Sequence, residues 1–410
     1  MHETIKRKLL LEAIAKRLKY APCVALLGPR QVGKTTMLKK LAENEKRTYV
    51  TLDTINARIL AKTDPVLFFQ TYKPPIIIDE AQYAPELFTQ IKIICDNSEQ
   101  TGLFWLTGSQ RYSMMKNIQE TLAGRIGILE LYSFSKNEKD NIAFNNELDF
   151  SLSCFKERQN IAPKNNVIEL FDHIWRGGMP QILKADFEQR QEYYTSYVDT
   201  YIMRDAAELG NVTDSSKFKR LLIACAALVS EQLNFKTLAD SAEISQPTAK
   251  EWVRLLESLG IIHLLQPYSN NILKRLTKTP KIYFCDTGLA AYLAMWLTPE
   301  TLLNGAASGH YFENYVVMEL VRYYTYAKTR ANLSYYRDSN AKEIDIFVEE
   351  NNTIHPFEIK KSANPDRREI NKFNIIDKSA LKRGNGGIIC MCEEVIPIDG
   401  ENCYIPCNLL

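Results

Sequence analysis

The sequence predicts an α/β protein with a parallel sheet near its N-terminus, and two short segments are the basis of this prediction. The first is a glycine-rich loop, residues 28–35, between the apolar run 23–27 and a helical pattern. The second is the apolar run 75–78, which ends in Asp79 and Glu80. Short apolar runs of this kind are typical of strands buried on both faces of a parallel sheet. Further strands are expected at 49–52, 103–107 and 126–131.

The loop at 28–35 reads Gly-Pro-Arg-Gln-Val-Gly-Lys-Thr and matches the G-x-x-x-x-G-K-T motif of P-loop NTPases. In such a loop the backbone N–H groups surround the phosphates of ATP, the lysine reaches the β- and γ-phosphates, and the hydroxyl binds Mg²⁺. We therefore predict Lys34 as a catalytic residue and Thr35 as a magnesium ligand. The predicted nucleotide-binding residues of the loop are Gly28, Pro29, Arg30, Gln31, Val32, Gly33, Lys34, Thr35 and Thr36.

The two acidic residues after the run 75–78 predict hydrolysis of ATP rather than binding alone. Asp79 would hold Mg²⁺, directly or through water, and Glu80 would orient and polarise the attacking water. Ser109 follows the next strand and is either a sensor of the γ-phosphate or part of a plain strand-end turn. Arg125 is either an arginine finger, in cis or across the interface of a homo-oligomer, or a surface arginine that caps a helix.

The composition indicates a globular protein of more than one domain. A chain of 410 residues is too long for one core, and its 45% hydrophobic and 24% charged residues are ordinary values. The net charge of +2 provides no global argument for nucleic acid binding. No apolar run approaches the ~20 residues that span a bilayer, so we expect a cytoplasmic protein without a membrane partner. The nine cysteines are expected to be reduced, and the C-terminal group Cys390, Cys392, Cys403 and Cys407 is interpreted as small buried hydrophobic residues rather than as a zinc site.

The middle of the chain predicts a winged helix-turn-helix. Apolar spacing indicates helices at 221–229, 235–244 and 245–259, followed by a strand at 261–265. The outward face of the third helix and the wing carry the polar and basic residues Gln246, Thr248, Lys250, Arg254, Lys274, Arg275, Lys278 and Lys281. These could contact DNA, or the region could have a purely structural or protein-docking role.

The C-terminal part holds a second group of chemical residues. Asp345 lies in the alternating strand 343–348, and Glu358 and Lys360 share one face of a strand thirteen positions later. If the two strands form a hairpin across 349–352, these residues meet. Asp345 and Glu358 would then bind Mg²⁺, Lys360 would steady the nucleophile or the developing charge in phosphodiester cleavage, and Glu313 could contribute from a helix. The alternative is a hairpin with ordinary surface charges.

Taken together, the motifs resemble those of prokaryotic AAA-like P-loop ATPases whose C-terminal half is a domain of unknown function related to restriction-endonuclease-like nucleases. The marks of the resemblance span nearly the whole chain and lie at 28–35, 76–82, 106–110, 122–125, 177–180, 201–205, 280–289, 312–314, 343–345 and 358–360. The resemblance implies ATP binding, ATP hydrolysis, a winged-helix middle region and a nuclease-like end. It implies no known substrate.

These observations predict four regions and leave three functions open. The expected regions are a P-loop ATPase domain at 1–135, a helical linker at 136–210, a winged helix-turn-helix at 211–295 and a restriction-endonuclease-like α/β domain at 296–410. The first function is an ATP-hydrolysing switch that acts on or near DNA. The second is a metal-dependent nuclease gated by ATP. The third is a signalling or docking module with an inactive nuclease fold.

Overall fold

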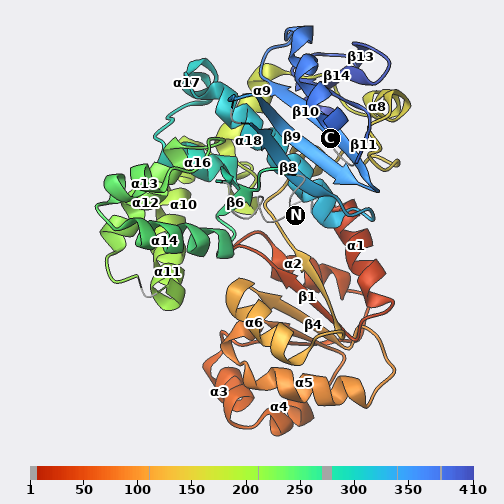
Figure 1. The fold of residues 1–410 in the computed structure, drawn as a ribbon. Coiled ribbons are helices and arrows are strands. Elements are labelled where there is room, and N and C mark those ends of the chain that lie inside the picture. The colour runs from red at the N-terminus through yellow and green to blue at the C-terminus, as the bar shows by residue number, and fades with distance from the viewer. Residues whose placement is uncertain (1–6, 110, 211, 270–278, 339, 379–380) are drawn as a thin grey trace. The chain divides into compact units, whose positions relative to one another are not determined.

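The computed structural model describes residues 7–109, 111–210, 212–269, 279–338, 340–378 and 381–410 (Figure 1). These residues fall into two compact units. The N-terminal unit contains residues 7–133 and 258–261. The C-terminal unit contains the described residues of 134–257 and 262–410.

In the described residues, the N-terminal unit is built on a five-stranded sheet in the order β2-β3-β4-β1-β5, and its neighbouring strands are parallel. The predicted P-loop NTPase fold with a parallel sheet is therefore confirmed. The strands are β1 (Cys23–Leu27), β2 (Thr48–Thr51), β3 (Ile76–Asp79), β4 (Phe104–Gly108) and β5 (Ile126–Glu130). The helices are α1 (Lys8–Leu18), α2 (Lys34–Leu41), α3 (Ile55–Thr63), α4 (Pro65–Thr71), the 3₁₀ turn η1 (Ala81–Tyr83), α5 (Glu86–Asp96) and α6 (Arg111–Thr121).

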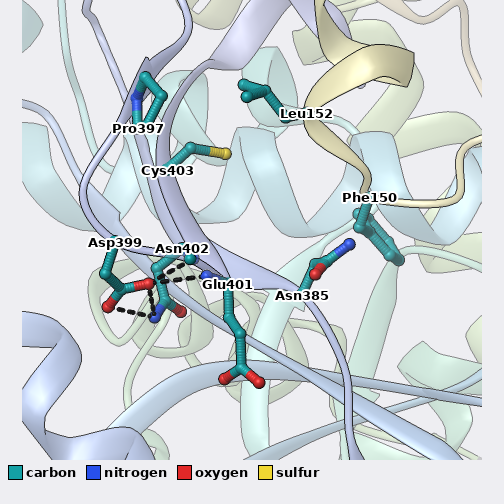
Figure 2. Close-up of a pocket in the computed structure, with 9 residues that line it drawn as sticks. Phe150, Leu152, Asn385, Pro397, Asp399, Glu401, Asn402 and Cys403 are labelled. Carbon is teal, nitrogen blue, oxygen red and sulfur yellow. Dashed lines mark hydrogen bonds between the residues drawn. The ribbon is translucent and has the colours of Figure 1, made fainter.

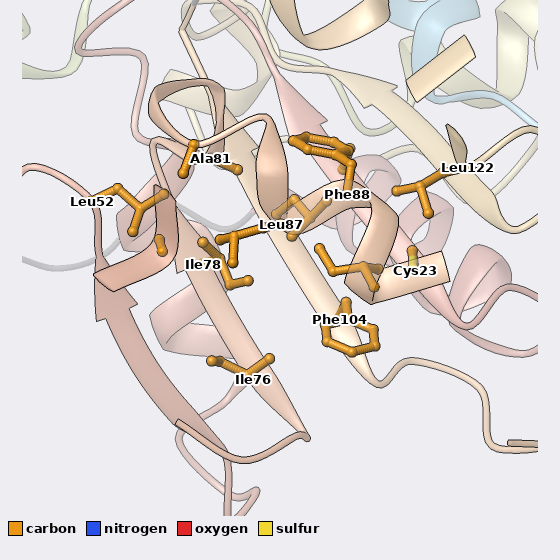
Figure 3. Packing of buried hydrophobic residues seen from close by; sticks show 14 of the residues in the cluster. Cys23, Leu52, Ile76, Ile78, Ala81, Leu87, Phe88, Phe104 and Leu122 are labelled. Atoms are coloured by element: carbon orange, nitrogen blue, oxygen red, sulfur yellow. The ribbon is translucent and has the colours of Figure 1, made fainter. Parts of the chain in front are cut away.

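The core of this unit explains why its strands are apolar throughout. Every residue of β1, β3 and β4 is buried, because helices cover both faces of the sheet. On one face, side chains from α3 to α6 pack against alternate residues of the strands, as Ile76, Ile78, Phe104, Leu87 and Phe88 illustrate (Figure 3). Helix α1 also packs against β1 and β5. All carboxyl ends of the strands share one edge of the sheet, where the predicted motif residues lie.

The first half of the C-terminal unit is helical. After α7 (Lys136–Lys139) the chain forms α8 (Leu152–Gln159), α9 (Val167–Arg176), the 3₁₀ turn η2 (Pro180–Ile182), α10 (Phe187–Ser196), the π-helix η3 (Tyr197–Ile202) and α11 (Met203–Gly210). It continues with α12 (Ser215–Ala227), α13 (Phe235–Ala242), α14 (Gln246–Ser258) and the antiparallel strands β6 (Ile262–Leu265) and β7 (Lys281–Phe284). Three helices and a strand pair thus occur in the predicted order.

Two of the sequence marks meet in this helical part. Asp286 caps α16 (Thr287–Leu293) by accepting a hydrogen bond from Leu289 N at 3.0 Å. The same carboxylate accepts hydrogen bonds from Gly178 N at 2.8 Å and from the Tyr194 hydroxyl at 2.6 Å. Gly177 has a φ of 84°, and a Cβ at this position would lie 2.3 Å from Asp286 Oδ1, so the tight junction requires glycine. These motif residues therefore stabilise helix packing.

The rest of the unit surrounds a mixed sheet, which includes seven strands in the described part of the chain in the order β13-β14-β12-β10-β9-β8, with β11 beside β10. The helices are α16 (Thr287–Leu293), α17 (Pro299–Asn304), α18 (Ser308–Tyr326) and the 3₁₀ segments η4 (Arg367–Lys378) and η5 (Cys407–Leu409). The strands are β8 (Asn332–Arg337), β9 (Glu343–Glu350), β10 (Thr353–Lys360), β11 (Lys382–Arg383), β12 (Gly386–Cys390), β13 (Ile396–Pro397) and β14 (Asn402–Pro406).

Two general features of the chain concern its environment. None of the described helices is both long and apolar enough to cross a bilayer. All nine cysteines are buried.

Candidate functional site

The glycine-rich loop connects β1 to α2, which begins at Lys34. Gly28 and Gly33 have φ values of 144° and 95°, which only glycine adopts without strain. The Lys34 side chain is 5% exposed, and its ammonium donates hydrogen bonds to the carbonyls of Gly28 at 2.9 Å and Pro29 at 2.7 Å. The loop therefore folds around its own lysine. A helix N-terminus and a buried ammonium at the same place form a site for an anionic group such as phosphate.

Asp79 lies beside this loop at the end of β3. Its Oδ1 accepts hydrogen bonds from Thr35 Oγ1 at 2.7 Å and Thr107 Oγ1 at 2.5 Å, and its Oδ2 accepts one from the Tyr49 hydroxyl at 3.0 Å. The two predicted magnesium ligands, Thr35 and Asp79, are thus in direct contact. A hydroxyl and a carboxylate are hard oxygen donors, so this pair fits Mg²⁺ completed by phosphate oxygens and water.

Glu80 follows at a left-handed φ of 55°, which turns the chain sharply after the strand. Its Oε2 accepts hydrogen bonds from Ser109 Oγ at 3.0 Å and Gln82 Nε2 at 2.5 Å. Its backbone N–H donates to Thr107 Oγ1 at 3.0 Å. The structure therefore brings the predicted residues Lys34, Asp79, Glu80 and Ser109 to one edge of the sheet.

Three residues of this site were missed in the sequence. Tyr49 and Thr107 hold Asp79 from the neighbouring strands β2 and β4, and Gln82 holds Glu80 from the following turn. A signal existed for Thr107 and Gln82, because each is a polar residue at or just after the end of an apolar run. Tyr49 lies near the start of a strand and gave no such signal.

Arg125 is not at this edge, and the cis form of its predicted role is wrong. It immediately precedes β5, whose first residue, Ile126, pairs with Cys23 at the beginning of β1. The arginine therefore lies at the amino edge of the sheet, opposite the glycine-rich loop. Its guanidinium pairs with the Asp96 carboxylate, with Nε to Oδ1 at 2.5 Å. A role across a subunit interface stays a prediction.

In the C-terminal unit, Asp345 and Glu358 meet as predicted. Antiparallel pairing of β9 and β10 sets Phe357 against Ile346, which places Asp345 and Glu358 side by side. The Lys360 ammonium lies 2.9 Å from Glu358 Oε2 and 3.6 Å from Asp345 Oδ2. Both carboxylates therefore face one lysine.

Two residues of η4 join this cluster and were not predicted. The Lys372 ammonium lies 2.9 Å from Glu358 Oε2 and 2.6 Å from Glu369 Oε2, and Glu369 also lies 3.8 Å from Lys360. Glu358 is 0% exposed. Burial raises the pKa of Glu358 to about 7; the charge of Asp345 acts in the same direction and Lys360 opposes it. Only tertiary contact could reveal η4, because its residues have no motif spacing with the strands.

Glu313 has other partners than those predicted. Its carboxylate accepts hydrogen bonds from Lys281 at 2.9 Å and the Tyr283 hydroxyl at 2.7 Å. Burial raises the pKa of Glu313 to about 7, against the effect of Lys281. Lys281 is 3% exposed and also lies 2.6 Å from Glu343, so its assignment to a basic wing surface is wrong.

In the described residues, no group of three or more His, Cys, Asp or Glu side chains is arranged to hold a metal ion.

The predicted outward face of the third helix is partly exposed. Gln246, Lys250 and Arg254 on α14 are exposed, and Thr248, whose hydroxyl lies 2.8 Å from that of Ser245, is half-buried. The other predicted wing residues lie outside the described residues; they are Lys274, Arg275 and Lys278.

The C-terminal unit also has a cavity of about 140 Å³ beside β14 (Figure 2). Phe150, Leu152 and Cys403 form part of its lining. The Asp399 carboxylate at its rim accepts hydrogen bonds from the backbone N–H groups of Glu401 at 2.9 Å and Asn402 at 2.8 Å. Asp399 thus stabilises the turn before β14.

Three regions of the chain match models of protein families. Residues 20–139 match a family model described as an AAA domain. Together with the parallel sheet and the glycine-rich loop, this match identifies a P-loop ATPase domain. Residues 168–300 and 308–410 match two models that are each described as a domain of unknown function, DUF8612 and DUF4143.

Full-length relatives and solved structures are also similar to this chain. An uncharacterized protein of Mycobacterium tuberculosis, Rv2008c, is 27% identical over 98% of this chain and 84% of its own length. An uncharacterized protein of Methanocaldococcus jannaschii, MJ1637, is 23% identical over 93% of this chain and 83% of its own length. A Walker-type ATPase of Pyrococcus abyssi covers 71% of this chain and 96% of its own, with 16% identity and a TM-score of 0.44.

Proposed function

We propose that this protein is an ATP-hydrolysing switch that acts on or near DNA. The observation that carries the proposal is the position of Glu80: a carboxylate directly after Asp79, at the sheet edge that also holds the glycine-rich loop, and in contact with Ser109 at 3.0 Å. A group in this place can accept a proton from a water molecule that attacks a phosphate bound in the loop.

Each residue of the site has one part in this proposal. Lys34 would exchange its bonds to the loop carbonyls for bonds to the β- and γ-phosphates, which neutralises charge on the nucleotide. Thr35 and Asp79 would hold Mg²⁺, which supplies Lewis-acid stabilisation of the phosphate charge. Glu80 would orient the water, and Ser109 would sense the γ-phosphate.

The DNA half of the proposal rests on the C-terminal unit. We interpret α12, α13, α14, β6 and β7 as a winged helix, because these elements follow one another in that order. The exposed Lys250 and Arg254 on α14 could reach a phosphate backbone or base edges. A structural or protein-docking role for these elements is the alternative.

The experiment that tests the proposal compares wild type with Lys34→Ala in ATP binding and phosphate release, with Mg²⁺ present. Loss of the ammonium is expected to weaken ATP binding roughly 10- to 100-fold, because a charge-assisted hydrogen bond contributes about 1.5–3 kcal/mol. Phosphate release should fall to background. Lys40→Ala is the matched control, since Lys40 is exposed on the same helix. A wild-type protein that binds no ATP, or a Lys34→Ala variant that behaves like Lys40→Ala, would refute the proposal.

An ATP-gated nuclease is the second candidate. It is favoured by the convergence of Asp345 and Glu358 on Lys360, and by Glu358 Oε1, which is buried without a hydrogen bond within the part of the chain that the structure describes. Two adjacent carboxylates could hold Mg²⁺ while the lysine steadies the nucleophile. The ion pair of Lys372 with Glu358 favours instead a closed, inactive cluster that serves docking.

A cleavage assay separates these two possibilities. If the site is a nuclease, wild type with Mg²⁺ or Mn²⁺ and ATP cuts DNA, and Glu358→Gln lowers the rate about 100-fold or more, because an amide is a far weaker metal ligand than a carboxylate. Glu349→Gln, at the far end of the same hairpin, should cut like wild type. If wild type cleaves neither single-stranded, duplex nor branched DNA, the nuclease candidate is rejected and the docking module remains.

A further inference from the structure

An arginine on α3 lies at the same edge of the sheet as Glu80. Arg58 donates hydrogen bonds from Nε to Leu52 O at 2.6 Å and from Nη2 to Asp53 O at 3.2 Å. Leu52 and Asp53 follow the carboxyl end of β2, the strand beside β3. Its guanidinium also stacks over the Tyr83 ring, with 4.5 Å from Cζ to the ring centroid. Three contacts therefore hold this half-buried side chain in one orientation.

The Tyr83 ring connects this arginine to the nucleotide loop and to Glu80. Tyr83 ends the short turn η1, whose first residue follows Glu80, and its N–H donates to Glu80 O at 3.1 Å. The Tyr83 hydroxyl accepts a hydrogen bond at 3.4 Å from Arg30, which belongs to the loop itself. Tyr83 thus contacts two guanidinium groups, that of Arg58 over its ring and that of Arg30 at its hydroxyl.

The charges at this edge give independent support. Four charged groups act electrostatically on the Asp53 carboxyl group: Glu80, Asp79, Arg30 and Arg58. Partial burial is the main reason that the pKa of Asp53 is raised; the negative charges of Glu80 and Asp79 add to it, while the two arginines oppose it. Arg58 therefore shares an electrostatic environment with the carboxylates of the hydrolytic site.

The orientation leaves one nitrogen of Arg58 available. Nε and Nη2 are bound to backbone carbonyls, and within the described residues Nη1 makes no hydrogen bond. A fixed guanidinium with one available donor is suited to contact a phosphate oxygen, because its position is set before the ligand arrives.

We propose that Arg58 is a catalytic residue of the ATPase site: a guanidinium supplied in cis that stabilises the charge developing on the γ-phosphate during hydrolysis. This inference rests on the proposed ATPase function. It assigns to Arg58 the cis role that the position of Arg125 excludes. The role requires no second subunit, because α3 and the loop belong to the same unit of one chain.

The test uses the full-length protein and a closely matched control. Arg47 precedes the same strand β2 at the opposite edge of the sheet; like Arg58 it bonds to backbone carbonyls and stacks over an aromatic ring, and it also pairs with Glu45 at 2.9 Å. Its guanidinium donates to Gly102 O at 2.8 Å and stacks over the Trp105 ring at 3.8 Å. Arg58→Ala and Arg47→Ala therefore remove similar structural contacts, but only the first removes a charge from the nucleotide edge.

We expect Arg58→Ala to lower kcat for ATP hydrolysis about 100-fold or more, with a change in KM below about threefold, because the lost contact acts mainly in the transition state. Arg47→Ala should keep kcat within about threefold of wild type. Arg58→Lys should recover only part of the rate, since an ammonium lacks the fork that bonds both carbonyls. Millimolar guanidinium added to Arg58→Ala should restore part of its activity, which a structural role would not allow.

Two results would overturn the inference alone. One is an Arg58→Ala variant that hydrolyses ATP like wild type. The other is an equal loss of activity and thermal stability in Arg58→Ala and Arg47→Ala, with no response to guanidinium, which would show a structural role. A wild-type protein that binds ATP without hydrolysing it would instead overturn the proposed function, and the inference would fall with it.

Discussion

Replacing Glu80 with glutamine is expected to lower kcat for ATP hydrolysis by about 100-fold or more while ATP still binds. A general base contributes about 10²- to 10⁴-fold, and an amide cannot take a proton from water. Glutamine has almost the same shape, and its oxygen can still accept the hydrogen bond from Ser109, which now measures 3.0 Å. The loss should therefore appear in kcat rather than in ATP affinity.

The measurement is steady-state phosphate release combined with equilibrium binding of labelled ATP in the presence of Mg²⁺. Glu86→Gln is the matched control, because Glu86 is exposed at the start of α5, only six positions away. This variant should turn over like wild type. Equal turnover by Glu80→Gln and wild type would remove Glu80 from the role of base and leave the site as an ATP-binding site.

Replacing Gly28 with alanine is expected to destabilise the N-terminal unit by about 2–5 kcal/mol and to abolish ATP binding. The added Cβ would lie 2.1 Å from Leu131 O, which belongs to the backbone just after β5 and cannot move aside easily. The φ of 144° adds strain for any residue with a side chain. A backbone clash of this kind costs about 1–3 kcal/mol beyond the strain itself.

Gly124→Ala separates the clash from the strain. Gly124 has a φ of 78° and nothing within 4 Å of the position of a Cβ, so its replacement should cost only about 1–2 kcal/mol. Guanidinium unfolding, followed together with binding of labelled ATP, measures both effects. If Gly28→Ala unfolds at the same denaturant concentration as Gly124→Ala, the loop does not need its close approach to Leu131.

The ATPase domain could be predicted because its signals are local. The glycine positions, Lys34 and Thr35 lie within eight residues between a strand and a helix, and the AAA domain match at 20–139 agrees. Likewise, the spacing of Asp345, Glu358 and Lys360 predicted that these residues meet across a hairpin at 349–352; the observed turn, Asn351 and Asn352, sets the register that brings them together. The catalytic roles of these residues stay predictions.

Other parts of the site depend on the order of the strands. Tyr49 and Thr107 reach Asp79 because β2 and β4 flank β3, and no spacing along the chain reveals that order. The burial of Lys281 between Glu313 and Glu343 is likewise a contact between distant segments. Arg125 is a different case, because a residue that directly precedes a parallel strand lies at the amino edge of the sheet. The prediction of a cis role for Arg125 could therefore have been rejected from the sequence.

Local chemistry along the chain was enough to predict a glycine-rich P-loop, a strand with two terminal carboxylates and a charged hairpin. This is so because backbone conformation over a few residues depends on glycine placement and on the alternation of apolar side chains. Which distant side chains contact the Asp79 and Glu80 carboxylates followed only from the folded sheet. Those contacts join residues that are 27 to 44 positions apart, and long-range packing alone brings them within hydrogen-bonding distance.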